Sequence, residues 1–193
     1  MKIALLAAAL SLAAPLRAET LDVASPQLAL AVDEPAFTAT RGKLDFADTG
    51  TGPDGAPYVI HEVIPADETF EDWKTLFAVF IEDDLALDFQ AYVGQVVRVY
   101  YLSCVDEPDI QVLGSSGDTA LDLTIYCRAY RDDPSTGELA QFALRRSGDD
   151  FARVYQHWRL PSDTDLGPWM TERIPEFSHF WDAARALTLT EID

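Results

Sequence analysis

The apolar positions of the chain change their spacing several times, and each change predicts a new element. Residues 37–47 and 58–64 alternate like strands around residues 49–55, which are dense in glycine and other turn formers. This arrangement predicts a hairpin with a long loop. Residues 97–104 and 121–127 also alternate and are rich in β-branched and aromatic side chains, which predicts two more strands.

The strongest turn signal lies between residues 139–146 and 151–158. These two alternating segments flank Ser147-Gly148-Asp149-Asp150, a short polar sequence that contains glycine. Two apolar runs joined by so few turn residues predict a tight β-hairpin.

Helical spacing occurs in three places. Thr69 and Asp72 fit a capping box, and the apolar residues that follow recur on one helix face: Trp73, Leu76, Phe77 and Phe80. A second helical stretch is predicted over residues 85–96. A third starts near Pro175 and carries an apolar stripe to Leu187.

Strands and helices are segregated along the chain, which is typical of the α+β class. We expect an antiparallel sheet of about five to six strands, covered by helices and carrying one disulfide, in a single domain over residues 37–193. Residues 19–36 contain two prolines and only short apolar pieces. They are expected to form a loosely ordered lead-in.

The segment from Ile64 to Trp73, in which a proline follows a strand and acids precede a tryptophan, resembles a stretch of uncharacterised exported bacterial proteins. The order of the predicted elements resembles the Mog1/PsbP-like group of small α/β/α sandwiches. This resemblance implies a fold. The group has no shared catalytic residues, so the resemblance implies none for this chain.

The first 18 residues have the features of a removable export signal. Lys2 precedes an apolar run from Ile3 to Ala14, and Pro15 breaks the run before the small residue Ala18. The run is shorter than the roughly 20 apolar residues that span a bilayer. The chain has 11 Arg against 3 Lys, and Ala and Asp are abundant, which is typical of a GC-rich bacterium. We therefore expect a soluble periplasmic or secreted protein without a membrane span.

Acidic side chains outnumber basic ones by 33 to 14, which gives a formal net charge of −19. A surface of this charge repels phosphate, which argues against nucleic acid as a partner. The apolar fraction of 48% is high enough for a folded core. The charge suits a salty habitat as well as it suits an interaction surface.

The two cysteines, Cys104 and Cys127, are expected to form a structural disulfide, because an exported protein meets an oxidising compartment. The alternative is a nucleophilic or redox thiol. No Cys-x-x-Cys spacing supports that alternative, and no histidine lies nearby in the sequence.

No motif in the sequence carries a recognised chemistry. The histidines, His61, His157 and His179, have no partner at zinc-ligand spacing. Residues 114–118 approach the elbow of a serine hydrolase but lack its second glycine. The acidic runs lack the order of a calcium loop. We expect no metal and no cofactor.

Aromatic and basic side chains on the expected strands are the remaining candidates for a binding site. If several of them share an uncovered face of the sheet, they would line a groove. The alternative is that the aromatic ones belong to the core. The candidate ligand-binding residues are Tyr100, Arg128, Arg153, Tyr155 and His157.

These features favour a non-enzymatic exported domain that binds an unknown envelope protein or a small ligand. The alternative is a cofactor-free hydrolase whose site is assembled only in three dimensions. Convergence of His157, Arg153 and an acid in one pocket would favour the enzyme. A filled sheet face with scattered charges would favour the binding domain.

We predict that export removes residues 1–18 and leaves Glu19 as the first residue, because the small residue Ala18 follows the apolar run at the expected cleavage point. The intact mass of the exported protein measures this directly. A purified species that retains Met1 would contradict the prediction.

Overall fold

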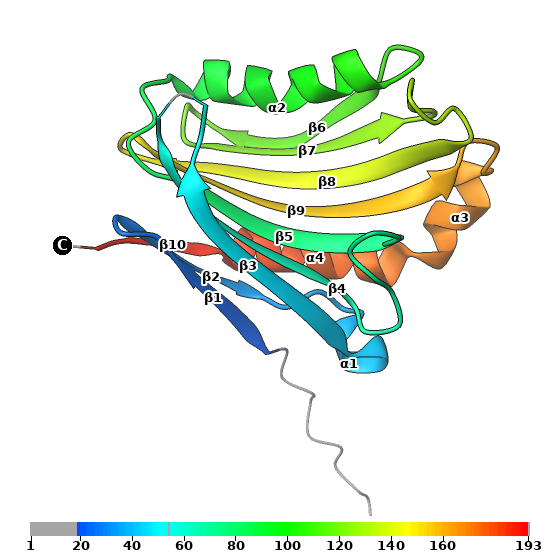
Figure 1. The fold of residues 1–193 in the computed structure, drawn as a ribbon, viewed down its shortest axis with the longest axis horizontal. Helices are drawn as coiled ribbons and strands as arrows, with labels where there is room; N and C mark the ends of the chain where they lie inside the picture. The colour runs from blue at the N-terminus through cyan, green and yellow to red at the C-terminus, as the bar shows by residue number, and fades with distance from the viewer. Residues whose placement is uncertain (1–18, 54, 193) are drawn as a thin grey trace, which may run out of the picture.

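The computed structural model describes residues 19–53 and 55–192, and the expected signal peptide, residues 1–18, lies outside them. Ten strands and four helices make up the described part of the chain (Figure 1). In chain order they are β1 (Thr20–Ala24), β2 (Leu28–Asp33), α1 (Thr38–Arg41), β3 (Lys43–Thr51), β4 (Pro57–Pro65), β5 (Thr75–Glu82), α2 (Phe89–Ser103), β6 (Asp109–Ser116), β7 (Ala120–Cys127), β8 (Thr136–Ser147), β9 (Asp150–Pro161), α3 (Leu166–Glu172), α4 (Ile174–Ala186) and β10 (Thr188–Glu191).

The main element is a seven-stranded antiparallel sheet in the order β3-β4-β5-β9-β8-β7-β6. Its longest pair is the β8–β9 hairpin, in which Ser147 pairs with Asp150 across the turn. Gly148 has a φ of 59° in this turn, a backbone conformation that glycine adopts without steric cost. A second, three-stranded sheet has the order β1-β2-β10. The α+β class is therefore confirmed.

Alternate residues of the large sheet face two different layers. On one face, Phe77 of β5 lies 6.5 Å from Phe180 of α4, measured between ring centroids. The apolar side chains of β1 and β2 complete this core. On the other face, Phe151 of β9 stacks on Tyr92 of α2 at 4.4 Å. The sheet is thus the middle layer, with α2 on one side and α4 with the small sheet on the other (Figure 1).

The expected strand count was too low, because β1, β2, β5, β6 and β10 form where the pattern predicted no strand. Residues 19–36, expected as a loosely ordered lead-in, contain β1 and β2, whose inward side chains, such as Leu28 and Leu30, are buried. The edge strand β6 also went unrecognised, because its side chains are mostly exposed and its alternation of polar and apolar residues ends at Val112. The strand expected over residues 37–47 starts only at Lys43, after the short helix α1.

The helix expected after Thr69 is wrong, because Thr75–Glu82 is the strand β5. This strand lies between β4 and β9 and is buried on both faces, so its apolar residues run almost continuously and match a helical spacing by chance. Thr69 Oγ1 does accept a hydrogen bond from the Asp72 backbone N–H at 3.2 Å. That bond closes a turn and starts no helix.

The second expected helix exists but is longer than predicted, and it replaces the strand expected over residues 97–104. Helix α2 begins after Asp88, whose carboxylate accepts a hydrogen bond from the Ala91 N–H at 2.7 Å. Its buried row continues through Val96 to Tyr100 at helical spacing. The β-branched residues of 97–104 suggested a strand, but packing of this row against the sheet outweighs their propensity.

Strands β4, β7, β8 and β9 and helix α4 lie where alternation or helical spacing placed them, whereas α3 and β10 were not predicted. Within residues 19–53 and 55–192, none of the helices combines the length and the apolar character needed to cross a bilayer.

The expected disulfide between Cys104 and Cys127 is present, with 5.7 Å between the two Cα atoms. Both residues are almost completely buried. Cys104 directly follows α2, and Cys127 is the last residue of β7. The bond therefore ties the C-terminal end of α2 to the sheet.

The exposed edge at β6 has an irregular ladder. The register of β6 against β7 shifts between Val112 and Gly114. Val112 and Leu113, at this shift, are 61% and 53% exposed. The bulge thus coincides with the most apolar part of the edge.

We predict that replacing both cysteines by alanine lowers the free energy of unfolding by about 3 kcal/mol, because the denatured chain loses the constraint of a closed loop. For a domain of this size the melting temperature should fall by roughly 6–12 °C. Thermal unfolding of the unaltered protein with and without reductant provides the comparison. Equal melting temperatures for the double variant and the oxidised protein would contradict a stapling role.

Candidate binding groove

Three adjoining hollows lie on the side of the large sheet that α2 covers. Their volumes are about 720, 350 and 570 Å³. The first and second share Tyr130, the first and third share Trp73, and the second and third share Tyr155 and His157. We call these three hollows together the α2 groove.

Alternate residues of β9 form a row that runs through all three hollows. Arg153, Tyr155, His157 and Arg159 are partly exposed, whereas the residues between them are buried in the opposite core. Because successive strand side chains point to opposite faces, the four share the face toward α2. Helix α2 lies across this row and contributes Tyr100 to the same side.

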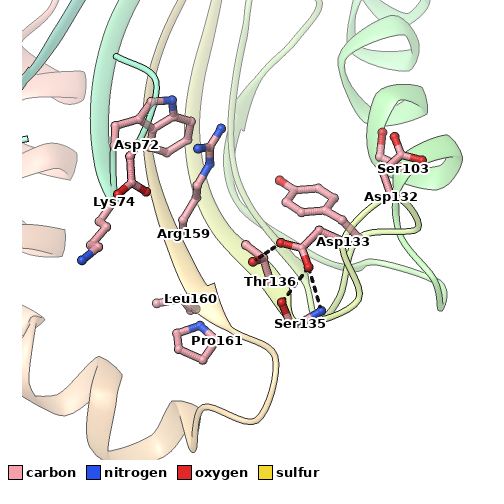
Figure 2. Close-up of a pocket in the computed structure, with 12 residues that line it drawn as sticks. Asp72, Lys74, Ser103, Asp132, Asp133, Ser135, Thr136, Arg159, Leu160 and Pro161 are labelled. Carbon is pink, nitrogen blue, oxygen red and sulfur yellow. Dashed lines mark hydrogen bonds between the residues drawn. The ribbon is translucent and has the colours of Figure 1, made fainter. Parts of the chain in front are cut away.

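The first hollow is polar and open (Figure 2). In it, Arg159 lies between Asp72 on one side and Asp133 and Thr136 on the other. The Arg159 guanidinium stacks on the Trp73 ring, with its carbon 3.7 Å from the ring centroid. Hydrogen bonds from Ser135 and Thr136 hold the pKa of Asp133 below its usual value. These contacts leave Asp133 fixed at the rim.

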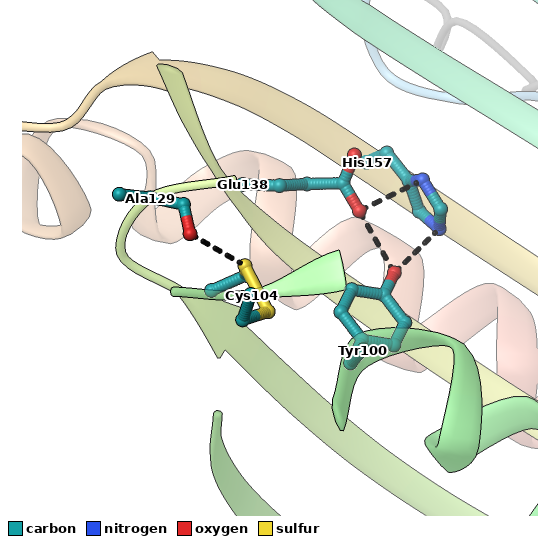
Figure 3. The surroundings of a disulfide bond; sticks show 6 residues. Tyr100, Cys104, Ala129, Glu138 and His157 are labelled. Carbon is teal, nitrogen blue, oxygen red and sulfur yellow. Dashed lines mark hydrogen bonds and ion pairs between the residues drawn. A yellow bond between two sulfur atoms is a disulfide. The ribbon is translucent and has the colours of Figure 1, made fainter. Parts of the chain in front are cut away.

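A buried carboxylate, Glu138 at the start of β8, organises the second hollow (Figure 3). Its Oε1 accepts a hydrogen bond from the Tyr100 hydroxyl at 2.8 Å and lies 3.2 Å from His157 Nδ1. Burial alone would raise the pKa of Glu138, but the nearby His157 and the hydrogen bonds lower it below its ordinary value. Burial and the Glu138 charge raise the pKa of Tyr100 well above its ordinary value.

This network also fixes the end of α2. Tyr100 lies one helical turn before Cys104, so the Glu138 contact and the disulfide act on the same end of the helix (Figure 3). The chain after β7 folds back against β8, and Gly137 permits the approach. A Cβ atom at Gly137 would lie 2.2 Å from the backbone oxygen of Arg128.

Arg153 lines the second hollow from the β9 side. Its guanidinium carbon lies 4.1 Å from the centroid of the Phe80 ring. Its Nε is buried and has no hydrogen-bond partner. The neighbouring Tyr155 hydroxyl has a pKa raised to about 12 by burial, with Arg153 acting in the opposite direction.

The structure brings four of the five sequence-predicted site residues together. Tyr100, Arg153, Tyr155 and His157 all line the second hollow. Arg128 does not, because the strand ends at Cys127 and Arg128 is exposed in the segment that follows. Tyr100 is 5% exposed. It therefore also belongs to the core, which was the alternative expected for the aromatic residues.

Sequence reasoning missed several groove residues. Glu138 carried a detectable signal, because it falls two residues before Ala140 and four before Phe142, on the apolar face of the same strand. A carboxylate in such a row indicates a buried partner. Trp73 lies in a segment expected to be a helix. Tyr130 is one of the aromatic residues expected on a shared sheet, but it lies in an irregular segment after β7.

The arrangement offers a histidine–carboxylate pair without an activated nucleophile beside it. His157 Nε2 lies 3.5 Å from the Tyr100 hydroxyl. A phenol whose pKa is raised well above normal is a poor nucleophile at neutral pH. In the described part of the chain, no group of three or more His, Cys, Asp or Glu side chains could hold a metal ion.

Comparison with known proteins identifies the fold alone. No protein-family model matches the chain, and no curated protein matches it. A solved structure of a point mutant of the protein Mog1 superposes with a TM-score of 0.50 at 10% identity, over 90% of this chain and 96% of that one. The Ran-binding protein Mog1p of Saccharomyces cerevisiae gives a TM-score of 0.48 at 10% identity, over 89% and 96%. The expected resemblance to the Mog1/PsbP-like group is confirmed for the fold.

We predict opposite pH dependences for two buried glutamates. The pKa of Glu138 is lowered from 4.5, so its ionisation stabilises the native fold above that pH, and this stabilisation is lost as the pH falls through the lowered value. Glu138→Gln should therefore cost about 3 kcal/mol at neutral pH and less in acid.

Glu62, in the third hollow, is the matched control. Burial raises its pKa, so its ionisation destabilises the native fold as the pH rises through the raised value. Glu62→Gln should leave stability unchanged in acid and increase it at neutral pH. Urea unfolding between about pH 3 and pH 7 tests both variants. A deficit of Glu138→Gln that stays constant over this range would refute the assignment.

Proposed function

We propose that this chain, which has the fold of Mog1, is a non-enzymatic exported binding domain whose ligand occupies the α2 groove. The observation that supports it is the continuity of the three hollows over one sheet face. Their lining comes from α2, from the strands β3, β4, β5, β8 and β9, and from the segments that precede β5 and β8. Side chains from separate parts of the chain thus converge on one surface, as in most ligand sites.

The chemistry of the lining suits recognition. Aromatic rings supply rigid apolar surface, and Tyr155 packs 4.8 Å from the His157 ring while Trp73 is covered by Arg159. Oε1 of the buried Glu138 contacts both Tyr100 and His157. These contacts preorganise the surface of the groove, which lowers the entropic cost of binding.

A periplasmic or secreted location is part of this proposal. It rests on the features of residues 1–18, and the buried disulfide supports it, because such bonds persist in oxidising compartments. The binding of Ran belongs to the yeast Mog1p, and at 10% identity the shared fold carries no partner over to this chain. The proposed ligand is an envelope protein or a small molecule.

One observation favours the second candidate, a cofactor-free hydrolase. His157, Arg153 and the acid Glu138 line the same hollow, which is the convergence expected of such an enzyme. The weakness of this candidate is the nucleophile. His157 Nε2 faces a buried phenol, so the pair is better suited to holding α2 than to activating a substrate.

We predict that small-molecule fragments bind preferentially in the α2 groove, because it combines concavity with aromatic walls. Amide chemical-shift mapping of the exported protein should place the perturbed residues around Trp73, Tyr130 and Tyr155. Tyr155→Ala should weaken the fragments by about tenfold. Tyr101→Ala is the control, because Tyr101 is 47% exposed on α2 and does not line the groove. Fragments that gather on another surface would refute the groove.

Ester hydrolysis by the exported protein distinguishes the binding domain from the hydrolase. A hydrolase that uses the histidine–carboxylate pair should cleave activated esters at a rate that His157→Gln reduces by at least about a hundredfold. A binding domain should show only slow hydrolysis that is equal in both proteins. Loss of ester cleavage in His157→Gln with an unchanged melting temperature would make the enzyme the better reading.

A further inference from the structure

Arg153 differs from the paired arginines of this protein in having no carboxylate partner. Arg41, Arg145, Arg146 and Arg185 each form an ion pair with an aspartate. Among residues 19–53 and 55–192, no acidic oxygen lies within ion-pair distance of the Arg153 guanidinium. Arg159 and Arg173 are also half-buried without an ion pair, but Arg153 is the arginine of the described residues whose Nε is both buried and without a hydrogen-bond partner.

The surroundings of Arg153 keep this cation available. The guanidinium rests on the face of Phe80, which fixes its plane without using its hydrogen-bond donors. Its Nε is buried and unpartnered. A buried donor of a charged group without a partner is costly. Arg153 as a whole is partly exposed and lines the hollow, so an anionic oxygen would meet the guanidinium from the open side.

The rest of the same hollow is largely apolar. Val96 and Val99 of α2 form one side, and Phe142 of β8 and Tyr155 of β9 form the other. Its volume of about 350 Å³ equals that of roughly a dozen water molecules at about 30 Å³ each. A ligand of this size would place a short hydrocarbon chain or a single ring between α2 and the sheet.

The charge balance limits the ligand to one negative charge. The Glu138 carboxylate lies in the same hollow and is held by Tyr100 and His157, so it repels a second anionic group. The net charge of −19 acts in the same direction. A guanidinium presents a planar fork of donors that matches a carboxylate.

We propose that this hollow, which we call the Arg153 pocket, binds a small monocarboxylic acid, with the carboxylate on Arg153 and the apolar body between Val96, Phe142 and Tyr155. The proposal rests on the proposed function, because it names the ligand class of the same groove. It adds a requirement that the groove alone does not make, namely a preference for a carboxylate over a cation of the same shape.

The test uses a matched set of probes with one hydrocarbon chain: octanoate, 1-octanol and octylammonium. Titration of the exported protein, followed by amide chemical shifts, should show octanoate in the Arg153 pocket. Octanoate should bind about tenfold or more tightly than 1-octanol, because a hydrogen bond to a charged group is added. Octylammonium should leave the pocket amides unshifted.

Variants at Arg153 assign the preference to the guanidinium. Arg153→Met should weaken octanoate to the level of 1-octanol, whereas binding of 1-octanol should stay unchanged. Arg153→Lys keeps the charge without the fork and should fall between the two. Arg98→Met is the control, because Arg98 is exposed on α2 and does not line the pocket. If Arg153→Met fails to fold, the proposal is tested by the selectivity of the unaltered protein between octanoate and octylammonium.

The outcomes separate this inference from the proposed function. Equal binding of octanoate and octylammonium, or octanoate binding that survives Arg153→Met, overturns the carboxylate pocket and leaves the groove standing. The carboxylate pocket is also overturned, and the groove left standing, if fragments bind in the groove but octanoate shifts no amide of the Arg153 pocket. Absence of every probe and fragment from the groove overturns both.

Discussion

The strict alternation of side chains along β9 is the constraint on which the site depends. This strand lies near the centre of the sheet, so every second residue is committed to the core against α4 and the small sheet. The others are left to face α2, and they include Arg153 and His157. A shift of register by one residue would exchange the two sets. The burial of the far core therefore fixes which residues reach the groove.

The position of α2 is the second determinant of the groove. Apolar contacts of its inner face hold the helix on β7, β8 and β9, but they act along its whole length. Near its C-terminal end, the disulfide and the hydrogen bond from Tyr100 to Glu138 add specific attachments. Removing one partner of such a buried contact leaves an uncompensated polar group, so Glu138 holds Tyr100 of α2 next to His157 of β9.

How far the sequence predicts this structure depends on whether a segment has one exposed face. Strands β7 and β9 and helix α4 each bury one side and leave the other more exposed, so their period is visible and their prediction succeeds. Strand β8 is buried on both faces, and the turn after it, which contains Gly148, identified the hairpin. Strand β5 is buried on both faces and has no usable period, which produced the false helix. The same logic explains the site. Arg153, Tyr155 and His157 were grouped because they share a strand face, whereas Arg128 lies beyond the end of its strand.

The irregular edge strand β6 bears on how copies of this protein behave toward one another. An open sheet offers unpaired backbone groups at its margins, and another molecule can extend the ladder there. The bulge between Val112 and Gly114 interrupts that template where the side chains are most apolar. Mutual repulsion from a net charge of −19 adds a long-range barrier to encounter. That barrier weakens as ionic strength rises. In concentrated salt, resistance of the protein to self-association therefore depends on the local geometry of β6.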